Sequence, residues 1–285
     1  MPLLAAAAGR RARASSALAL LLALLAAASA AAPQSAQQLA PSGDAAALAA
    51  PLAFPQPCTI PRHAGGGPLS LAAFRAAYKG ARPVIFTPAT PSAAAAAALS
   101  RGALLAAYGH LPVTLASANS NSYAKRASTL RGSLREHMAP VPPGAPADRL
   151  WYLFGDTLAS EAWAPLHATF ALPLDAARDD PVVAWGVGGL HSGVPFHRHG
   201  AVYAESVLGA KRWWLAPPGA APAFDGNATQ LSYALARQGR GEDAGVLACT
   251  VAQGEAIYIP AQWWHATLNL NEYTAFTSAF VREQG

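Results

Sequence analysis

The chain is predicted to be mainly β, with an all-β sandwich or barrel in its C-terminal part and a mixed α/β region before it. After residue 181, short runs rich in Val, Ile, Tyr, Phe and Trp alternate with Gly, Pro and Asn turns, which is typical of such folds. Before that point, helical patterns and short apolar runs are interspersed. Hydrophobic residues make up 53% of the 285 residues and charged residues 12%, a composition that excludes a mainly disordered polyelectrolyte.

Eight apolar runs account for the predicted barrel or sandwich. Their spacing, with turn residues between them, is that of short antiparallel strands. One insertion, from Thr229 to Gln238, has the pattern of a short helix. The runs lie at 182–190, 194–199, 201–208, 211–218, 246–252, 256–260, 263–270 and 274–280.

The region from 58 to 180 mixes helix and strand patterns. A helix is predicted over 70–80, because Ser70 can cap its N-terminus and apolar residues follow at helical spacing. One or two Ala/Leu-rich helices are predicted over 91–108, ending at Gly109. Further helices are predicted over 123–138 and 157–166, and short strands at 82–86, 113–115 and 150–154.

The first thirty residues have the pattern of a targeting signal. A basic stretch from Arg10 to Arg13 precedes an apolar run over 17–28, and Ala28-Ser29-Ala30 is a small-residue cleavage pattern. The dense apolar stretch is shorter than the roughly 18 residues that a membrane-spanning helix needs. We predict a signal peptide over 1–30, with an uncleaved membrane anchor as the alternative, and a flexible linker over 31–57.

A signal peptide predicts a protein of the endoplasmic reticulum lumen or a secreted protein. No stable membrane span is expected after cleavage. The formal net charge of +5 also falls, because loss of three arginines leaves 17 basic residues against 15 acidic ones. No stripe of basic residues with interleaved aromatics stands out, so nucleic acid is not an expected partner.

Secretion changes the interpretation of the two cysteines. Cys58 and Cys249 are the only pair in the sequence, and an even count in an oxidising compartment predicts one disulfide. Two buried thiols are the alternative. Asn227 begins the only N-x-S/T sequon, in a loop-like stretch, and is the predicted glycosylation site.

His197-Arg198-His199 is the strongest local signal for chemistry. Residues i and i+2 of a strand point to the same face, so both imidazoles can reach one metal ion. His265 lies in a later predicted strand and offers a third nitrogen donor, which leaves other coordination positions open. The alternative is buried, hydrogen-bonded and chemically inert histidines. We interpret Trp213, Trp214, Trp263 and Trp264 as packing residues, and His63, His110, His137, His167 and His191 as incidental.

Three segments follow one another around these histidines: FHRHG, GAKRWWLAPP and IPAQWWHATLNL. In this order they resemble the JmjC branch of the cupin fold, and the similarity runs from about Pro57 to about Phe280. The resemblance implies a double-stranded β-helix, or jelly-roll, over 181–285, with the α/β region of 58–180 packed on it. Many JmjC proteins are iron(II)- and 2-oxoglutarate-dependent oxygenases. The resemblance therefore implies Fe(II) at the three histidines, with zinc as the alternative, and 2-oxoglutarate as co-substrate.

Two further residues are candidates for binding the co-substrate. The resemblance implies that Lys211 holds the distal carboxylate of 2-oxoglutarate, a role that a fixed ammonium group suits; a solvated hairpin lysine is the alternative. A three-residue loop would place Lys211 opposite Val207 and on the histidine face, whereas a two-residue loop would turn it away. Tyr203 shares the strand parity of the histidines and is predicted to line the same pocket.

The sequence departs from the family pattern at two positions. His199 stands where active members usually carry Asp or Glu, and a neutral imidazole lacks the negative charge that helps to hold a divalent ion. Glu205 has matching parity but lies about 20 Å farther along an extended strand, too far to substitute. Val194 stands where many members have a hydroxyl group that binds the co-substrate.

Three functions therefore stay open. The first is a protein hydroxylase with an atypical three-histidine site, acting on a protein substrate. The second is a catalytically inactive cupin scaffold that binds a protein partner. The third is a structural zinc or copper site. Retention of Lys211 beside the histidines favours the first, and the missing carboxylate favours the other two.

Overall fold

The structure, a computed structural model, describes residues 58–63, 68–90, 92–117, 129–138, 151–154, 161–220, 222–226, 228–238 and 240–281. The predicted signal peptide (1–30), the predicted linker (31–57) and Asn227 lie outside the described residues. Within them, no helix has both the length and the apolar character needed to cross a membrane.

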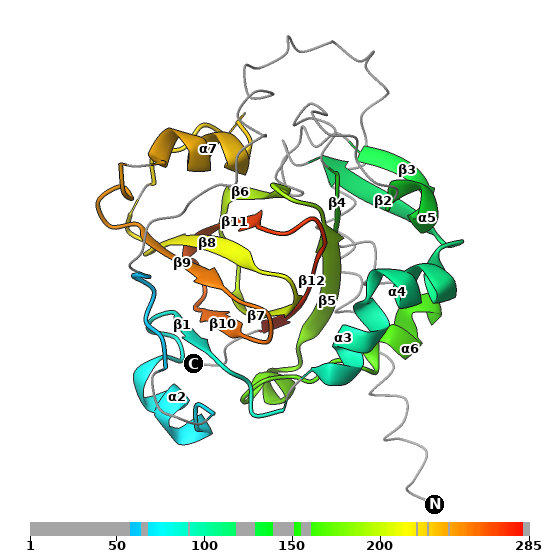
Figure 1. Cartoon of the computed structure of the whole chain (residues 1–285). Coiled ribbons are helices and arrows are strands. Elements are labelled where there is room, and N and C mark those ends of the chain that lie inside the picture. Colours follow the sequence, from blue (N-terminus) through cyan, green and yellow to red (C-terminus); the bar gives the residue numbers. More distant parts are fainter. Residues whose placement is uncertain are drawn as a thin grey trace, which may run out of the picture. The chain divides into compact units, whose positions relative to one another are not determined.

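Two antiparallel sheets enclose the interior of the C-terminal region (Figure 1). The chain passes back and forth between them, so that β10-β7-β12-β5 lie in the larger sheet and β6-β11-β8-β9 form the smaller one. This is the topology of a double-stranded β-helix, and the predicted jelly-roll is confirmed. The strands are β5 (Val182–Gly188), β6 (Gly193–His197), β7 (Ala201–Leu208), β8 (Lys211–Ala216), β9 (Leu247–Val251), β10 (Ala256–Ile259), β11 (Trp264–Asn269) and β12 (Thr274–Val281).

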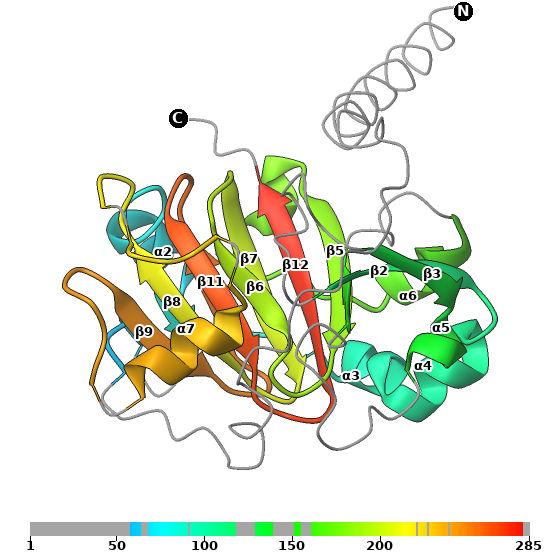
Figure 2. The same cartoon turned by 90° about the horizontal axis from the view of Figure 1, so that it is seen from above.

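Both faces of the larger sheet are buried, which explains why its strands are almost continuously apolar. On β7, Val202 and Ala204 pack inside the barrel with Trp213, whereas Tyr203 points outward against Phe74. The smaller sheet is covered on its outside by α7 (Gln230–Arg237), the predicted helix of the insertion (Figure 2). Thr229 caps this helix, because its hydroxyl group accepts a hydrogen bond from the Ser232 N–H at 2.9 Å.

The region before residue 181 adds strands to both edges of the larger sheet. On one side β1 (Val84–Phe86) pairs with β10. On the other side β4 (Trp151–Phe154), β2 (Pro112–Ser117) and β3 (Thr129–Ser133) extend the sheet from β5. The helical elements are α2 (Leu71–Ala77), α3 (Ala93–Leu99), α4 (Arg101–Tyr108), α5 (Leu134–His137) and α6 (Ala164–His167), with 3-10 turns η3 (Glu161–Trp163) and η4 (Ala176–Asp179).

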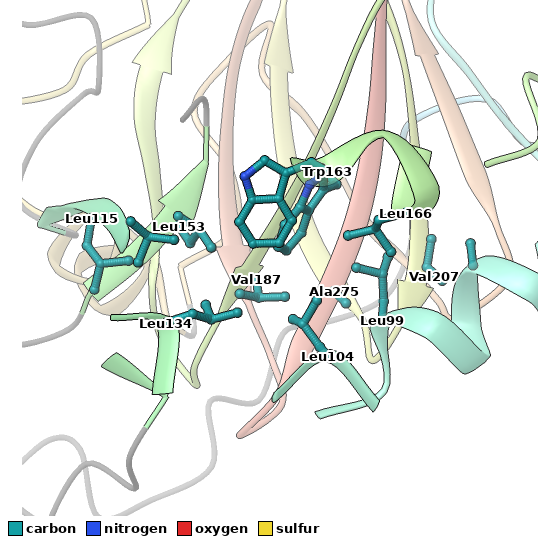
Figure 3. Packing of buried hydrophobic residues seen from close by; sticks show 13 residues of the cluster. Leu99, Leu104, Leu115, Leu134, Leu153, Trp163, Leu166, Val187, Val207 and Ala275 are labelled. Atoms are coloured by element: carbon teal, nitrogen blue, oxygen red, sulfur yellow. The ribbon is translucent and has the colours of Figure 1, made fainter. Parts of the chain in front are cut away.

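A second core lies between these helices and the outer face of the larger sheet. Figure 3 shows Leu99, Leu104 and Trp163 packed against Val187 of β5. The rings of Trp163 and Trp185 meet edge to face with their centroids 5.0 Å apart. The helices therefore bury the sheet face that points away from the barrel interior.

The helix predicted over 123–138 is wrong for residues 129–133 and is confirmed for Leu134–His137. Residues 129–133 form β3, which pairs with β2, and helix begins only at Leu134. A capping box marks the change: the Ser133 hydroxyl group accepts the Glu136 N–H, and the Glu136 carboxylate accepts the Ser133 N–H. β3 is the last strand of the larger sheet, and its sequence TLRGS has no alternation of apolar and polar residues, so its local pattern does not identify a strand.

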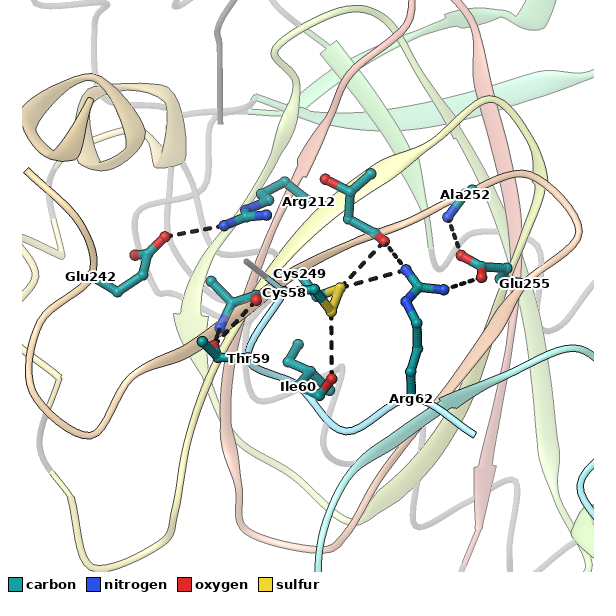
Figure 4. The surroundings of a disulfide bond; sticks show 11 residues. Cys58, Thr59, Ile60, Arg62, Arg212, Glu242, Cys249, Ala252 and Glu255 are labelled. Carbon is teal, nitrogen blue, oxygen red and sulfur yellow. Dashed lines mark hydrogen bonds and ion pairs between the residues drawn. A yellow bond between two sulfur atoms is a disulfide. The ribbon is translucent and has the colours of Figure 1, made fainter. Parts of the chain in front are cut away.

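The predicted cysteine pair is joined in the structure. Cys58 and Cys249 form a disulfide across 191 residues, with their Cα atoms 4.5 Å apart (Figure 4). Beside it, Thr59 exchanges hydrogen bonds with Ala248: its N–H donates to the carbonyl oxygen at 2.9 Å, and its hydroxyl group accepts from the N–H at 2.8 Å. Arg62 donates to the Thr250 carbonyl and pairs with Glu255. The start of the described chain is thus attached to the smaller sheet.

Asp175 connects α2 to the outer face of the larger sheet. Its buried carboxylate accepts hydrogen bonds from Arg75 Nε and Lys79 Nζ, each at 3.0 Å, and from the Tyr203 hydroxyl group at 2.9 Å. Burial would raise the pKa of Asp175, but these hydrogen bonds outweigh it and lower the pKa. The stabilisation is therefore present at neutral pH and is lost as the pH falls through the acidic range.

We expect Asp175→Ala to lower the free energy of unfolding by about 2–4 kcal/mol, because three donors lose one buried acceptor. Asp179→Ala is the matched control: among the described residues this carboxylate accepts from Lys79 only, so a loss below about 1 kcal/mol is expected. Urea denaturation of both variants measures the difference. Equal losses would contradict the assignment of Asp175 as the central acceptor.

Candidate metal centre

Three histidines converge at one end of the barrel interior. His197 is the last residue of β6 and lies opposite His265 of β11 in the antiparallel register. His199 follows the end of β6, so it is not part of the strand on which it was predicted. The ring centroid of His265 is nevertheless 4.1 Å from that of His197 and 4.5 Å from that of His199. One ligand atom from each histidine lies within 4.8 Å of the other two.

A backbone hydrogen bond holds His199 in place beyond its strand. Its carbonyl oxygen accepts the N–H of Gln262 at 2.7 Å, which links the segment after β6 to the segment before β11. Gln262 has a positive φ of 66°, an uncommon conformation for a residue with a side chain. The turn before β11 therefore helps to position His199 beside His265.

Backbone carbonyl groups orient all three rings. The Nδ1 atoms of His197, His199 and His265 lie 2.9, 2.7 and 2.9 Å from the carbonyl oxygens of Pro195, Gly200 and Trp263. A carbonyl oxygen can only accept, so each Nδ1 carries the proton and each Nε2 has the lone pair. This tautomer is the one in which histidine binds a metal ion through Nε2.

The arrangement suits a cation at the centre of the three rings. His199 Nε2 and His265 Nε2 are 3.0 Å apart, and two lone pairs at this distance repel each other unless a positive charge lies between them. Burial, followed by the charge that His199 would carry, lowers the pKa of His197 to about 3. Burial also lowers the pKa of His199 and takes that of His265 well below its usual range. The imidazoles are therefore neutral at pH 7, as metal ligands must be.

The histidines line a cavity with about 460 Å³ of empty space, including the part open to solvent. Its walls combine aromatic and polar side chains from both sheets. None of the described residues that line the cavity is acidic. The lining residues are Tyr152, Phe154, Val194, His197, His199, Val202, Lys211, Trp213, His265, Thr267, Phe276, Ser278 and Phe280.

Lys211 is buried in this cavity. Its Nζ lies 3.6 Å from the centroid of the Phe276 ring and donates to the Tyr152 hydroxyl oxygen at 3.5 Å. No carboxylate of the described residues forms an ion pair with it. Burial lowers the pKa of Lys211 to about 7. A buried ammonium group without a counter-ion is suited to binding an anionic ligand.

Both loop-length alternatives for Lys211 assumed a hairpin between β7 and β8, and that assumption is wrong. β7 and β8 belong to different sheets, so they form no hairpin, and Val207 packs outside the barrel under the helices. Lys211 instead pairs with Asn269 of β11 and Val251 of β9. It reaches the histidine face because β8 lies in the same sheet as β6 and β11.

Tyr203 does not line the cavity, contrary to the prediction. It lies on the outer face of β7 and donates to Asp175, while its neighbour Val202 faces the histidines. The chain changes sheets between β6 and β7, so parity counted from His197 does not continue into β7. Glu205 shares the outward face and accepts a hydrogen bond from the Ser92 hydroxyl group at 2.7 Å.

Sequence patterns missed several residues of the cavity. Tyr152 comes from a strand before residue 181, and nothing in its local pattern shows that β4 extends the barrel sheet. Trp213, interpreted as a packing residue, lines the cavity opposite Thr267 of β11. A signal was available for Thr267, because it is two residues after His265 in the same strand and therefore faces the same side.

A jelly-roll barrel with three convergent histidines places this chain in the cupin class of folds, with a cluster that could hold a metal ion. No model of a known protein family matches the chain. JmjC domain-containing protein 8 of Rattus norvegicus is 36% identical over 226 residues, which cover 79% of this chain and 82% of that protein. The Homo sapiens protein of the same name is 36% identical over 231 residues, or 79% of this chain and 84% of that protein. The chain therefore belongs to the JmjC family.

More distant similarity extends to a plant protein and to solved structures. Lysine-specific demethylase JMJ21 of Arabidopsis thaliana is 26% identical over 248 residues, covering 76% of this chain and 25% of that protein. The structure of ycfD from Escherichia coli has a TM-score of 0.45 at 16% identity, covering 76% of this chain and 54% of that one. YcfD in complex with cobalt and 2-oxoglutarate, described as a ribosomal oxygenase, has a TM-score of 0.45 at 15% identity, covering 76% of this chain and 52% of that one.

Proposed function

We propose that this protein is a metal- and 2-oxoglutarate-dependent hydroxylase of protein side chains that works in the secretory pathway. One observation carries the proposal: three metal-competent imidazoles line the same cavity as a buried lysine that pairs with no carboxylate of the described residues. The fold supports it, because the barrel brings these groups together from β6, β8 and β11. The predicted signal peptide and the disulfide support placement in the endoplasmic reticulum lumen or outside the cell.

Each residue has a defined part in this function. The Nε2 atoms of His197, His199 and His265 would hold a divalent ion, and the Nδ1–H groups keep the rings oriented through their carbonyl partners. Lys211, with Tyr152 beside it, would bind a carboxylate of the co-substrate. A bound iron(II) ion would supply the oxidising chemistry. Aromatic side chains such as Phe276 make the walls of the cavity largely apolar.

A visible absorption spectrum under anaerobic conditions tests this function. Iron(II) is added first and 2-oxoglutarate second. We expect a charge-transfer band that needs both additions and is lost in His197→Ala. Absence of the band, together with absence of bound metal, would rule out the oxygenase function.

The missing carboxylate favours a second function, an inactive cupin scaffold that binds a protein partner. Of the described residues that line the cavity none is acidic, and a carboxylate ligand is usual in active members of the family. The variant His199→Asp separates the two functions. Turnover of 2-oxoglutarate that occurs only in this variant would identify the natural chain as inactive, whereas turnover by the natural chain supports the hydroxylase.

Binding of 2-oxoglutarate is expected to weaken as the pH rises above about 7. The carboxylate needs the ammonium form of Lys211, and burial places its pKa at about 7. At saturating Co(II), isothermal titration calorimetry should show a dissociation constant that increases by up to about tenfold per pH unit above the pKa. Lys211→Arg keeps its charge across this range and should bind with little pH dependence. A pH-independent constant in the natural chain would contradict the role of Lys211.

A further inference from the structure

Residues 58–63, called here the N-terminal strap, connect the edges of the two barrel sheets. On the smaller sheet, the Thr59 N–H donates to the Ala248 carbonyl oxygen of β9 at 2.9 Å. On the larger sheet, the Ile85 N–H of β1 donates to the Pro61 carbonyl oxygen at 2.9 Å. The strap is therefore attached to β9 and to β1, the two strands that end the sheets on this side.

The two sulfur atoms of the disulfide that holds the strap differ in exposure. Cys58 is partly exposed, whereas Cys249 is 1% exposed and packs in the barrel core. The rate of thiol–disulfide exchange depends on access to the attacked sulfur and on how well the other sulfur leaves as a thiolate. The difference in exposure favours attack at Cys58, with Cys249 as the leaving group.

Arg62 places a positive charge beside the buried sulfur. Its Nη2 lies 3.5 Å from Sγ of Cys249 and donates to the Thr250 carbonyl oxygen at 2.7 Å, while its Nη1 pairs with Glu255 (Figure 4). The guanidinium group stays charged, and a neighbouring cation stabilises a cysteine thiolate. Glu255 offsets part of this charge, but it binds the nitrogen that points away from the sulfur. The arrangement therefore assists the departure of Cys249.

We propose that the Cys58–Cys249 disulfide is a thiol–disulfide exchange site of the folded protein, with an external thiolate as the reactant. The thiolate attacks Sγ of Cys58, the bond between the two cysteine sulfurs breaks, and Cys249 keeps its electron pair and leaves as a thiolate beside Arg62. A second external thiolate then attacks the reactant's sulfur in the mixed disulfide, so that Cys58 is released as a thiolate. Two thiols are oxidised to one external disulfide, and the protein disulfide is reduced by two electrons.

Exchange at this site changes how the barrel is held together. Ile60 of the strap is 2% exposed and packs in the same core as Trp213, which lines the cavity of the histidines. Reduction removes the covalent link between the strap and β9 and leaves the hydrogen bonds and these apolar contacts. The inference goes beyond the proposed function, because no step of it uses the metal site.

The kinetics of reduction under native conditions test whether the folded protein exchanges. Samples of the oxidised protein with excess thiol are trapped by alkylation and mapped by mass spectrometry. We expect a rate proportional to thiol concentration and a first mixed disulfide on Cys58. A rate that levels off at the rate of global unfolding, or a first adduct on Cys249, would overturn the proposal. 2-Mercaptoethanol and a Cys-x-x-Cys peptide are used in parallel: exchange with either supports the site, and the larger rate constant identifies a small thiol or a protein dithiol as the source.

The direction of the change in Arg62→Gln separates a role in exchange from a role in packing. Loss of the charge beside the leaving sulfur should slow reduction by about 3- to 10-fold. Thr59→Val is the matched structural variant: it removes the hydroxyl group that accepts the Ala248 N–H at 2.8 Å and changes no charge. A looser strap should be reduced as fast as the natural chain or faster. Faster reduction of Arg62→Gln would show that Arg62 only holds the strap, and would overturn its role.

A second arginine variant controls for the loss of net charge. Arg82 is exposed; it donates to the Ala77 carbonyl oxygen and lies over the Tyr78 ring. Arg82→Gln therefore removes the same charge without altering the surroundings of the disulfide. Its rate of reduction should stay within about twofold of that of the natural chain. A loss equal to that of Arg62→Gln would assign the effect to attraction of the thiolate by net charge and overturn the role of Arg62.

Discussion

Replacing His265 with alanine is expected to weaken Co(II) binding more than about 100-fold. Loss of a residue that only hydrogen-bonds to a metal ligand already weakens metal binding by about 10- to 100-fold, and loss of a ligand itself should cost more. His265 is the central ring of the three: it lies opposite His197 in the strand register, and its Nε2 is 3.0 Å from that of His199. Its loss leaves two nitrogen donors that no longer surround one point. Equilibrium dialysis in the presence of 2-oxoglutarate measures the effect.

The matched control for this variant is His167→Ala. His167 packs against Phe170, with ring centroids 5.5 Å apart, and lies in α6 outside the cavity. Its replacement by alanine removes one imidazole, as the His265→Ala exchange does, and should leave Co(II) affinity unchanged. Circular dichroism verifies that both variants are folded. A folded His265→Ala protein that binds Co(II) as the natural chain does would exclude the three-histidine site.

Removing the disulfide is expected to lower the free energy of unfolding by about 2–5 kcal/mol. The bond connects residues 191 positions apart, so it restricts the unfolded chain over most of the folded region. Chain-entropy arguments predict a large effect for such a long loop, near the upper end of that range. Urea denaturation of the double variant Cys58→Ser, Cys249→Ser, compared with the oxidised natural chain, measures the difference.

A reductant provides the control for the disulfide prediction. Dithiothreitol should lower the stability of the natural chain to that of the double variant and should leave the variant unchanged. Thiol titration of the unfolded, unreduced chain should find no reactive cysteine. Two reactive thiols, with no effect of the reductant, would favour the alternative of two buried free cysteines.

Local patterns were sufficient to locate the strands of the barrel. Each of the eight apolar runs overlaps one strand, and the predicted insertion helix begins at Gln230 after its Thr229 cap. The reason is physical: a strand buried on both faces needs a continuous apolar run, and turn residues must separate it from the next strand. Residues 129–133 lack such a run because β3 is an edge strand, and there the prediction was wrong.

The candidate site was predictable only in part. The spacing of His197 and His199 and the later His265 identified a possible metal site, but the spacing could not show that the Nδ1 atoms meet backbone carbonyl groups. Tyr152 and Phe276, which surround Lys211, come from β4 and β12 and have no local pattern that connects them to the histidines. Contacts between distant segments depend on how the strands are ordered in each sheet.

By itself, the sequence determined the strands of the barrel, the cysteine pair and the three histidines, and its resemblance to the JmjC family implied the jelly-roll class. Only the tertiary structure decided which face of each strand enters the cavity. Tyr203 turned outward and Lys211 turned inward, because the chain changes sheets around Gly200 and again between β7 and β8. Side chains alternate between the two faces within one strand. When the chain passes to the other sheet, this alternation does not continue, so the face of each side chain cannot be counted from the previous strand.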